Sequence, residues 1–308
     1  MMRPLAPALL GLLGLLFAGA ALAEEKILFI GNSFTYGAGS PVQTYRANTV
    51  HNLNDEGMGG LPALFKAFTN EAGLSYDVSI ETHPGIGLDW HLAQKAEVIG
   101  RQRWDTVVMH GYSTLDQAHP GDPTMLLQTA QQMAALLRRQ NPDVALHFIA
   151  TWPRADQVYQ PNGAWHGKTV EAMASDVRRG YEKAAASISG MKATAPVGSA
   201  WIRAIKAGVA TRNPYEPLPA DQVNLWAADS YHASVYGSYL EALVVFGTVT
   251  GQDPRGLGAG ECAAKDLGLS TAQATRLQQI AFDQLAEDLK LKPARQTSSS
   301  KTHSCPIN

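Results

Sequence analysis

The segment 26–35, KILFIGNSFT, constrains the fold of this chain more than any other stretch. Its four apolar residues, 27–30, predict a short buried strand, and the Gly31, Asn32 and Ser33 that follow predict a sharp turn. A serine on a turn at the carboxyl end of a first β-strand is a frequent position for a nucleophile in open α/β sheets. The alternative is an ordinary strand-to-loop turn, so the rest of the chain has to decide between the two.

Apolar runs of strand length alternate with segments of helical periodicity along the rest of the chain. The sequence predicts further strands at residues 76–81, 104–109, 144–150 and 193–197. It predicts helices at residues 61–72, 88–99, 123–140, 170–187, 201–207, 234–249 and 272–291. This alternation predicts an α/β fold in one domain, a three-layer α/β/α sandwich around a mostly parallel sheet.

A long polar and glycine-rich segment, residues 36–60, follows the predicted turn. A loop of this length without secondary structure is uncommon in a compact domain and is often functional. Because it begins beside Ser33, we expect it to cover or wall a site there. A surface insertion without a function is the alternative.

The first 23 residues have the pattern of a Sec-type signal peptide. Arg3 gives a positive start, an apolar run covers residues 9–22, and Ala21-Leu22-Ala23 resembles a cleavage site. We expect cleavage after Ala23 and a mature protein that is periplasmic or secreted, without stable insertion in a membrane. An uncleaved membrane anchor is the alternative, although the run is shorter than the ~20 residues that a span requires.

The folded domain is expected to span residues 24–292, and the polar residues 293–308 are expected to form a flexible tail. The chain has two cysteines, Cys262 and Cys305, which could form one disulfide in an exported protein. Without a nearby pair of histidines they do not form a zinc site. The formal net charge of −2 gives no indication of nucleic acid or an anionic membrane surface as a partner.

A serine hydroxyl needs a base to become a good nucleophile, and the usual base is a histidine that a carboxylate orients. The chain offers such a pair in the sequence DSYH, with Asp229 and His232 three residues apart, just before an apolar helix. This spacing allows the carboxylate and the imidazole to belong to one turn. His147 lies inside an apolar strand, which is more typical of a core residue.

The two segments together resemble the sequence blocks of the SGNH, or GDSL-type, hydrolases. The first block of that family is Gly-Asp-Ser-Leu or a variant, and this chain has GNSF at residues 31–34. The last block is Asp-x-x-His, and this chain has DSYH at residues 229–232. Residues 232–242 are also similar to the helix that follows the histidine in a bacterial branch of the family. The resemblance covers residues 26–251.

The resemblance implies a role for each matching residue. Ser33 would attack the acyl carbon, His232 would act as general base and then as acid, and Asp229 would orient the imidazole. The backbone N–H of Ser33 would be one donor to the oxyanion, and a glycine after the second strand would give another. Gly85 matches that glycine best, and Gly87 is the alternative. The family uses no metal and no cofactor, so none is expected here.

The third block of the family, Gly-x-Asn after the third strand, is altered in this chain. The corresponding residues are His110, Gly111, Tyr112 and Ser113, so Tyr112 takes the place of the asparagine and is expected to donate to the oxyanion. His110 or Ser113 could substitute for it, or these residues could simply close the strand. Loss of one such donor reduces the rate by about 10²–10³-fold.

The predicted topology brings these residues together. In a flavodoxin-like sheet with strand order 2-1-3-4-5, ligands bind at the carboxyl ends of strands 1 and 3. Asn32 and His110 follow those two strands and are expected to contact the substrate. Trp152 follows the fourth strand and could form an aromatic wall for a sugar ring or an acyl group, unless it is a packed core residue.

These observations predict an exported serine ester hydrolase that forms an acyl-enzyme intermediate. Its expected substrate is a small-molecule or glycan ester from which it removes acetyl or short acyl groups. A lipase or lysophospholipase is the main alternative among enzymes. A non-catalytic glycan-binding protein on the same fold is the alternative outside them, since a fold alone does not determine a function.

Overall fold

A parallel β-sheet forms the centre of the computed structural model, which describes residues 24–294 and residue 305. Its strands are β1 (Glu25–Gly31), β2 (His51–Asn52), β3 (Tyr76–Thr82), β4 (Thr106–Met109), β5 (Ala145–Ile149) and β6 (Met191–Ala195). Neighbours in the order β2-β3-β1-β4-β5-β6 all pair in parallel. The five longer strands confirm the predicted flavodoxin-like order, and β2 is an additional strand at one edge.

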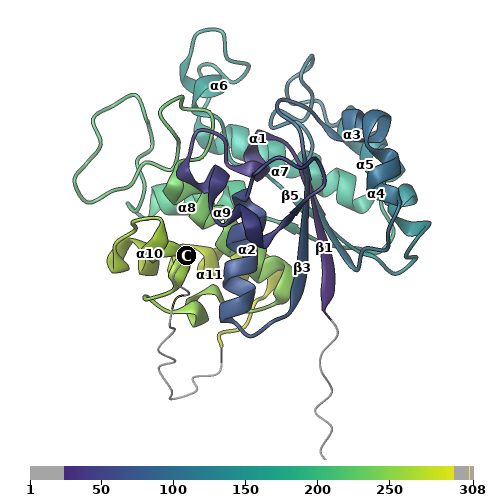
Figure 1. The fold of residues 1–308 in the computed structure, drawn as a ribbon. Coiled ribbons are helices and arrows are strands. Elements are labelled where there is room, and N and C mark those ends of the chain that lie inside the picture. Colours follow the sequence, from purple (N-terminus) through teal and green to yellow (C-terminus); the bar gives the residue numbers. More distant parts are fainter. Residues whose placement is uncertain (1–23, 295–304, 306–308) are drawn as a thin grey trace, which may run out of the picture.

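Two layers of helices cover the sheet (Figure 1). One layer contains α2 (Gly60–Glu71), α8 (Val197–Lys206), α9 (Val235–Thr250) and α11 (Thr271–Leu289). The other contains α3 (Leu88–Gln94), α4 (Ala96–Gly100), α5 (Thr124–Arg138) and α7 (Val170–Ala186). The central α9 is buried along residues 237–247, because α2, α8 and α11 all pack against it. The predicted α/β/α sandwich is therefore confirmed.

Several short elements differ from the sequence-based expectation. The segment 36–60 is not structureless: it follows α1 (Ser33–Tyr36) with two 3₁₀ turns, Pro41–Thr44 and Ala47–Thr49, and then β2. Its own backbone bonds and its pairing with β3 order it, for example the N–H of Gly59 donating to the carbonyl of Gln43 at 2.8 Å.

Other short helices were not predicted because they contain too few turns to show a periodicity. They are α6 (Ala155–Tyr159), α10 (Cys262–Asp266) and the 3₁₀ turn Pro254–Leu257. The helix predicted at residues 88–99 is interrupted at Lys95 and forms α3 and α4.

A disulfide joins Cys262, the first residue of α10, to Cys305, so this residue of the predicted tail is tied to the domain. The predicted signal peptide and most of the predicted tail lie outside the described residues. Among the residues that are described, no helix has both the length and the apolar character required to cross a membrane.

Candidate active site

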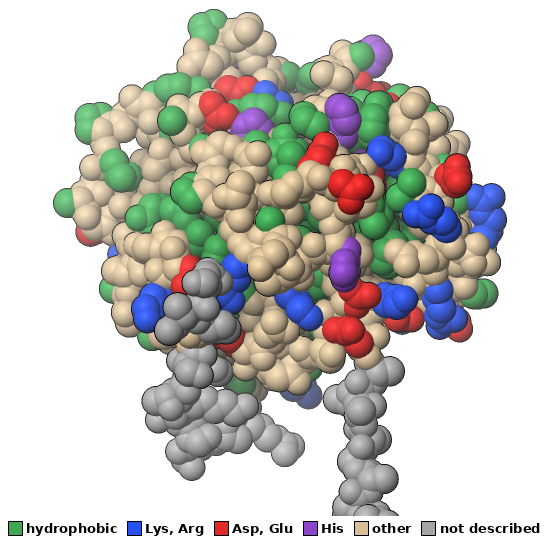
Figure 2. All heavy atoms as spheres, viewed as in Figure 1, with side chains coloured by type: hydrophobic (Ala, Val, Ile, Leu, Met, Phe, Trp, Pro, Cys, Tyr) green, Lys and Arg blue, Asp and Glu red, His purple; other side chains and the backbone are tan. Residues whose placement is uncertain are grey.

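The turns that follow β1, β3 and β4 lie at one edge of the sheet. Gly31 pairs with Thr82 and Ile30 pairs with Met109, so the three strands end at nearly the same level. This is the edge beside α1 in Figure 1, and Figure 2 shows histidine and carboxylate side chains close together there. The structure therefore gathers the predicted site residues as the strand order requires.

The turn that carries Ser33 is held by the side chain of Asn32. Asn32 Oδ1 accepts a hydrogen bond of 3.0 Å from the N–H of Phe34 and caps α1. Its Nδ2 donates to the carbonyl of Ile86 at 2.8 Å and to that of Gly111 at 3.3 Å. Because these bonds engage both ends of its buried amide, Asn32 is a structural residue of the turn. Its expected contact with the substrate stays a prediction.

His232 and Asp229 form an acid–histidine pair. Asp229 Oδ2 lies 2.6 Å from His232 Nδ1, and its Oδ1 accepts the backbone N–H groups of Tyr231 and His232 at 3.0 and 2.9 Å. Partial burial alone would raise the pKa of Asp229, but these hydrogen bonds outweigh burial and lower it. With Nδ1 directed at the carboxylate, Nε2 is the nitrogen left to accept a proton, and it has no hydrogen-bond partner among the described residues.

The serine turn and the histidine turn lie against each other. The ring of Phe34, next to Ser33, is 5.8 Å from the His232 ring between centroids. Gly39 also approaches His232, since a Cβ placed on Gly39 would lie 4.0 Å from the Cβ of His232. No hydrogen bond joins Ser33 and His232 in the described part of the chain. Catalytic bonds of this kind are often long without substrate and shorten in the complex.

Comparisons with known proteins agree with this architecture. A DUF4886 family protein from Bacteroides uniformis superposes with a TM-score of 0.56 at 15% identity, over 88% of this chain and 97% of its own. A protein assigned as a GDSL-like lipase from Parabacteroides merdae superposes with a TM-score of 0.50 at 13% identity, over 74% and 96%. The chain has the SGNH-hydrolase fold.

One further structure that is similar to this chain is a protein assigned as an SGNH hydrolase from Slackia heliotrinireducens. It shares 22% identity over 73% of this chain and 99% of its own, with a TM-score of 0.49. No protein-family model matches the sequence, and no curated protein matches it.

Trp152 is part of the core beneath the turn that carries Ser33 and is fully buried. Its ring stacks between those of Phe34, at 3.9 Å, and Trp201, at 5.1 Å. Its Nε1 donates to the carbonyl of Tyr231 at 3.1 Å. Trp152 therefore connects the serine turn to the histidine turn. The expectation that it walls the substrate pocket is corrected, because the turn directs Phe34 inward and covers it.

His110 is also a structural residue. It is buried, its Nδ1 lies 2.9 Å from the carbonyl of Gly111, and its Nε2 lies 2.7 Å from Thr35 Oγ1. A carbonyl can only accept, so Nδ1 carries the proton and Nε2 accepts from the threonine hydroxyl. Burial lowers the pKa of His110 to about 4, so the ring is neutral near pH 7. The expected contact with substrate is corrected here as well.

Tyr112 directs its hydroxyl towards Asp89 of α3. The hydroxyl donates to Asp89 Oδ2 at 3.3 Å. Burial and the nearby Asp89 carboxylate raise the pKa of Tyr112, while a backbone hydrogen bond with Gly87 acts in the opposite direction. The Tyr112 proton is therefore already engaged by Asp89, and its expected role in place of the family's oxyanion-binding asparagine stays a prediction.

The two glycines considered as oxyanion donors differ in their surroundings. Gly87 is packed against Tyr112, since a Cβ on Gly87 would lie 2.5 Å from Tyr112 Cε2. Gly85 lies in the exposed turn after β3, has a φ of 68°, and has free space where a Cβ would be. Gly85 remains the predicted second donor.

Arg154 lies beside the histidine turn at the rim of the site. Its guanidinium lies 3.7 Å above the Tyr231 ring, and it donates to Asp156 at 3.0 Å and to Ser113 Oγ at 3.4 Å. Its side chain is only 16% exposed. Arg154 thus connects the segment after β4 to the histidine turn at the rim of the site.

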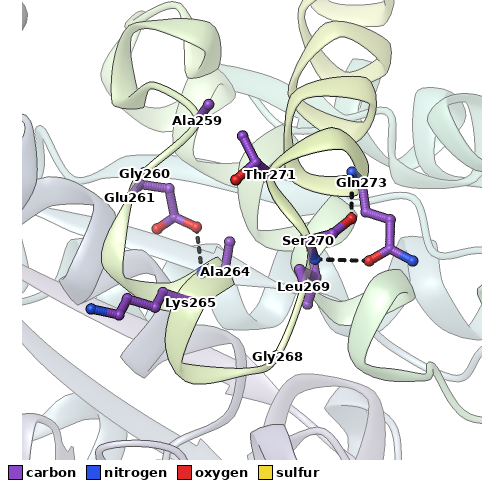
Figure 3. A pocket seen from close by; sticks show the side chains of 10 residues that line it. All are labelled: Ala259, Gly260, Glu261, Ala264, Lys265, Gly268, Leu269, Ser270, Thr271 and Gln273. Atoms are coloured by element: carbon purple, nitrogen blue, oxygen red, sulfur yellow. Dashed lines mark hydrogen bonds between the residues drawn. The ribbon is translucent and has the colours of Figure 1, made fainter.

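A separate cavity of about 370 Å³ lies between α10 and the start of α11 (Figure 3). Its wall includes Lys265 and the capping box in which Ser270 and Gln273 bond each other. It contains none of the predicted catalytic residues, and we assign it no part in the chemistry at Ser33.

Proposed function

We propose that this chain is an SGNH-type serine ester hydrolase that acts through an acyl-enzyme intermediate. The observation that carries the proposal is the 2.6 Å bond between Asp229 and His232, which leaves Nε2 without a partner beside the Ser33 turn. A pair of this geometry gives a serine hydroxyl the base that it needs.

The proposed reaction has two halves. Ser33 Oγ attacks the carbonyl carbon of the ester while His232 Nε2 takes its proton, and Asp229 stabilises the imidazolium that forms. The N–H groups of Ser33 and Gly85 bind the negative oxygen of the tetrahedral intermediate. The intermediate collapses, the alcohol leaves with the proton from His232, and a water molecule then releases the acid from Ser33 by the same steps.

The rim of the site favours an ester of a polar alcohol. The rim is polar there: the Arg154 guanidinium pairs with the Asp156 carboxylate and also donates to the Ser113 hydroxyl, so the two charges balance. Phe34 and Trp152 fill the space below the serine turn with a stacked pair of buried rings. A short acyl group on a carbohydrate or small ester suits this arrangement better than a long chain.

A lipase-type acylhydrolase is the second candidate, and the GDSL-like lipase with the same fold favours it. We also propose that the protein is exported, on the N-terminal sequence pattern alone.

An active-site probe and a series of esters test the proposal together. We expect a fluorophosphonate to label folded protein at Ser33, and the rate on 4-nitrophenyl esters to be greatest for acetate or butyrate. A maximum at long acyl chains would replace the short-acyl substrate with a lipid ester. Failure to label folded protein, with no turnover of any ester, would favour a non-catalytic binding protein.

A further inference from the structure

A second acid–histidine pair lies beneath the serine turn, and the proposed reaction does not use it. Glu81 is on β3 and His91 is on α3, and both side chains are fully buried. His91 Nδ1 lies 3.4 Å from Glu81 Oε1, while its Nε2 lies 2.8 Å from the carbonyl oxygen of Gly31. That carbonyl ends β1, two residues before Ser33.

The two contacts of His91 determine where its protons can be. A backbone carbonyl only accepts hydrogen bonds, so Nε2 must carry a proton. Nδ1 faces Glu81 Oε1 at 3.4 Å, an ion-pair contact that is not a hydrogen bond in this structure. With one further proton on either Nδ1 or Glu81, the pair has no net charge, which makes its burial tolerable.

The Glu81 side chain has one charged neighbour among the described residues, His91. Neither of its carboxyl oxygens has a hydrogen-bond partner among the described residues, and the approach of His91 is its only ion-pair contact there. Burial of a carboxyl group without hydrogen bonds lowers the stability of the folded state. Its effect is therefore exerted through His91 and on the Gly31 carbonyl.

We propose that Glu81 and His91 are positioning residues for the nucleophile: Glu81 orients the imidazole, and its Nε2–H fixes the peptide that leads into Ser33. This inference rests on the proposed function of Ser33. The bond acts on the turn from below, while Asn32 ties the same turn to the segments after β3 and β4. A displacement of about 1 Å at such a turn can reduce a rate by about 10²-fold.

Two amide variants of His91 separate this role from simple packing. In His91→Gln the amide nitrogen can reach the position of Nε2 and donate to Gly31. In His91→Asn it reaches only the position of Nδ1 and leaves that carbonyl without a donor. We expect kcat on 4-nitrophenyl acetate to stay within about fivefold for Gln and to fall about 10²-fold for Asn, with KM within about twofold for both.

Glu81→Gln and Leu285→Ala are the companion variants. The amide of Glu81→Gln can donate to Nδ1 and keep the proton on Nε2, so kcat should stay within about threefold. Leu285→Ala is the control for a general loss of stability: it leaves a cavity in the core at α11 and should lower Tm without the fall of about 10²-fold in kcat that is expected for His91→Asn. Equal kcat for His91→Gln and His91→Asn, or a loss in Glu81→Gln as large as that in His91→Asn, would overturn the proposal.

Hydrogen exchange at residues 31–34 distinguishes failure of this inference from failure of the proposed function. We expect these amides to exchange at least about tenfold faster in His91→Asn than in His91→Gln, whether or not the protein hydrolyses esters. If the wild-type protein is inactive but this exchange difference is found, the proposed esterase activity is refuted, while the proposal that His91 holds the turn stands. Equal exchange rates in the two variants would overturn the proposal that His91 holds the turn.

Discussion

Asp229 Oδ2 and His232 Nδ1 are 2.6 Å apart within one four-residue turn, so the acid and the base of the site are placed by a single local structure. Ser230, between them, has a φ of 59°, which turns the chain tightly enough for the side chains to meet. The packing of the two turns, with Trp152 connecting them, then sets the pair against Ser33.

Asp229→Asn should lower kcat by about 10³–10⁴-fold and leave KM nearly unchanged. The amide cannot hold the imidazole with its proton on Nδ1 or stabilise the imidazolium, and comparable changes in serine hydrolases have effects of this size. Asp288→Asn, which alters a carboxylate on α11, is the matched control and should keep the wild-type kcat. A loss below about tenfold for Asp229→Asn would mean that this carboxylate does not orient the base.

Tyr112→Phe should change kcat by less than about fivefold, because its hydroxyl donates to Asp89. Removal of a true oxyanion donor would lower kcat by about 10²–10³-fold, and steady-state kinetics on a short ester separate the two outcomes. A loss in the larger range would show that the hydroxyl turns towards the substrate when it binds.

The stability of the fold should decrease as the pH falls from 6.5 towards 4. The pKa of buried His110 is lowered from 6.5 to about 4, so in this window the unfolded chain binds a proton that the folded chain does not. Between pH 7 and pH 5 this contributes about 2 kcal/mol of lost unfolding free energy. Urea titrations at the two values should show a smaller loss for His110→Asn.

His147 should contribute to the same acid-induced loss, since burial also lowers its pKa to about 4. The variants His110→Asn and His147→Asn should each remove a part of the acid-induced loss. An unchanged loss in His110→Asn would contradict a neutral, buried His110.

Replacement of the Cys262–Cys305 disulfide should affect stability and not chemistry. The bond closes a loop with a sequence separation of 43, and in the double variant Cys262→Ser/Cys305→Ser its loss should remove about 2–4 kcal/mol of unfolding free energy. Denaturant titration with and without a reductant measures this, and kcat should stay near that of the wild type. A lower kcat in a fully folded double variant would instead show that the position of α10 affects the active site.

The parts of the fold with long periodic patterns could be predicted from the sequence, and so could the five longer strands and their order. The proximity of Asp229 and His232 followed from their spacing in the chain. The two-residue strand β2 and the short helix α6 leave no periodic signal, because their formation depends on contacts with distant segments.

The orientation of single side chains could not be predicted in this way. Phe34 stacks on Trp152 and covers it, and α3 brings Asp89 to the hydroxyl of Tyr112. Both contacts join residues that are far apart in the sequence. Residue type and strand order place such side chains at the right edge of the sheet, but tertiary packing decides which of them face the substrate.

The nucleophile itself is tested most directly by comparing Ser33→Ala with the wild type on 4-nitrophenyl acetate. We predict turnover by the wild type, a rate near the uncatalysed background for Ser33→Ala, and the same circular dichroism for both. Equal rates in the two folded proteins, on this ester and on acetylated glycans, would contradict the central role of Ser33.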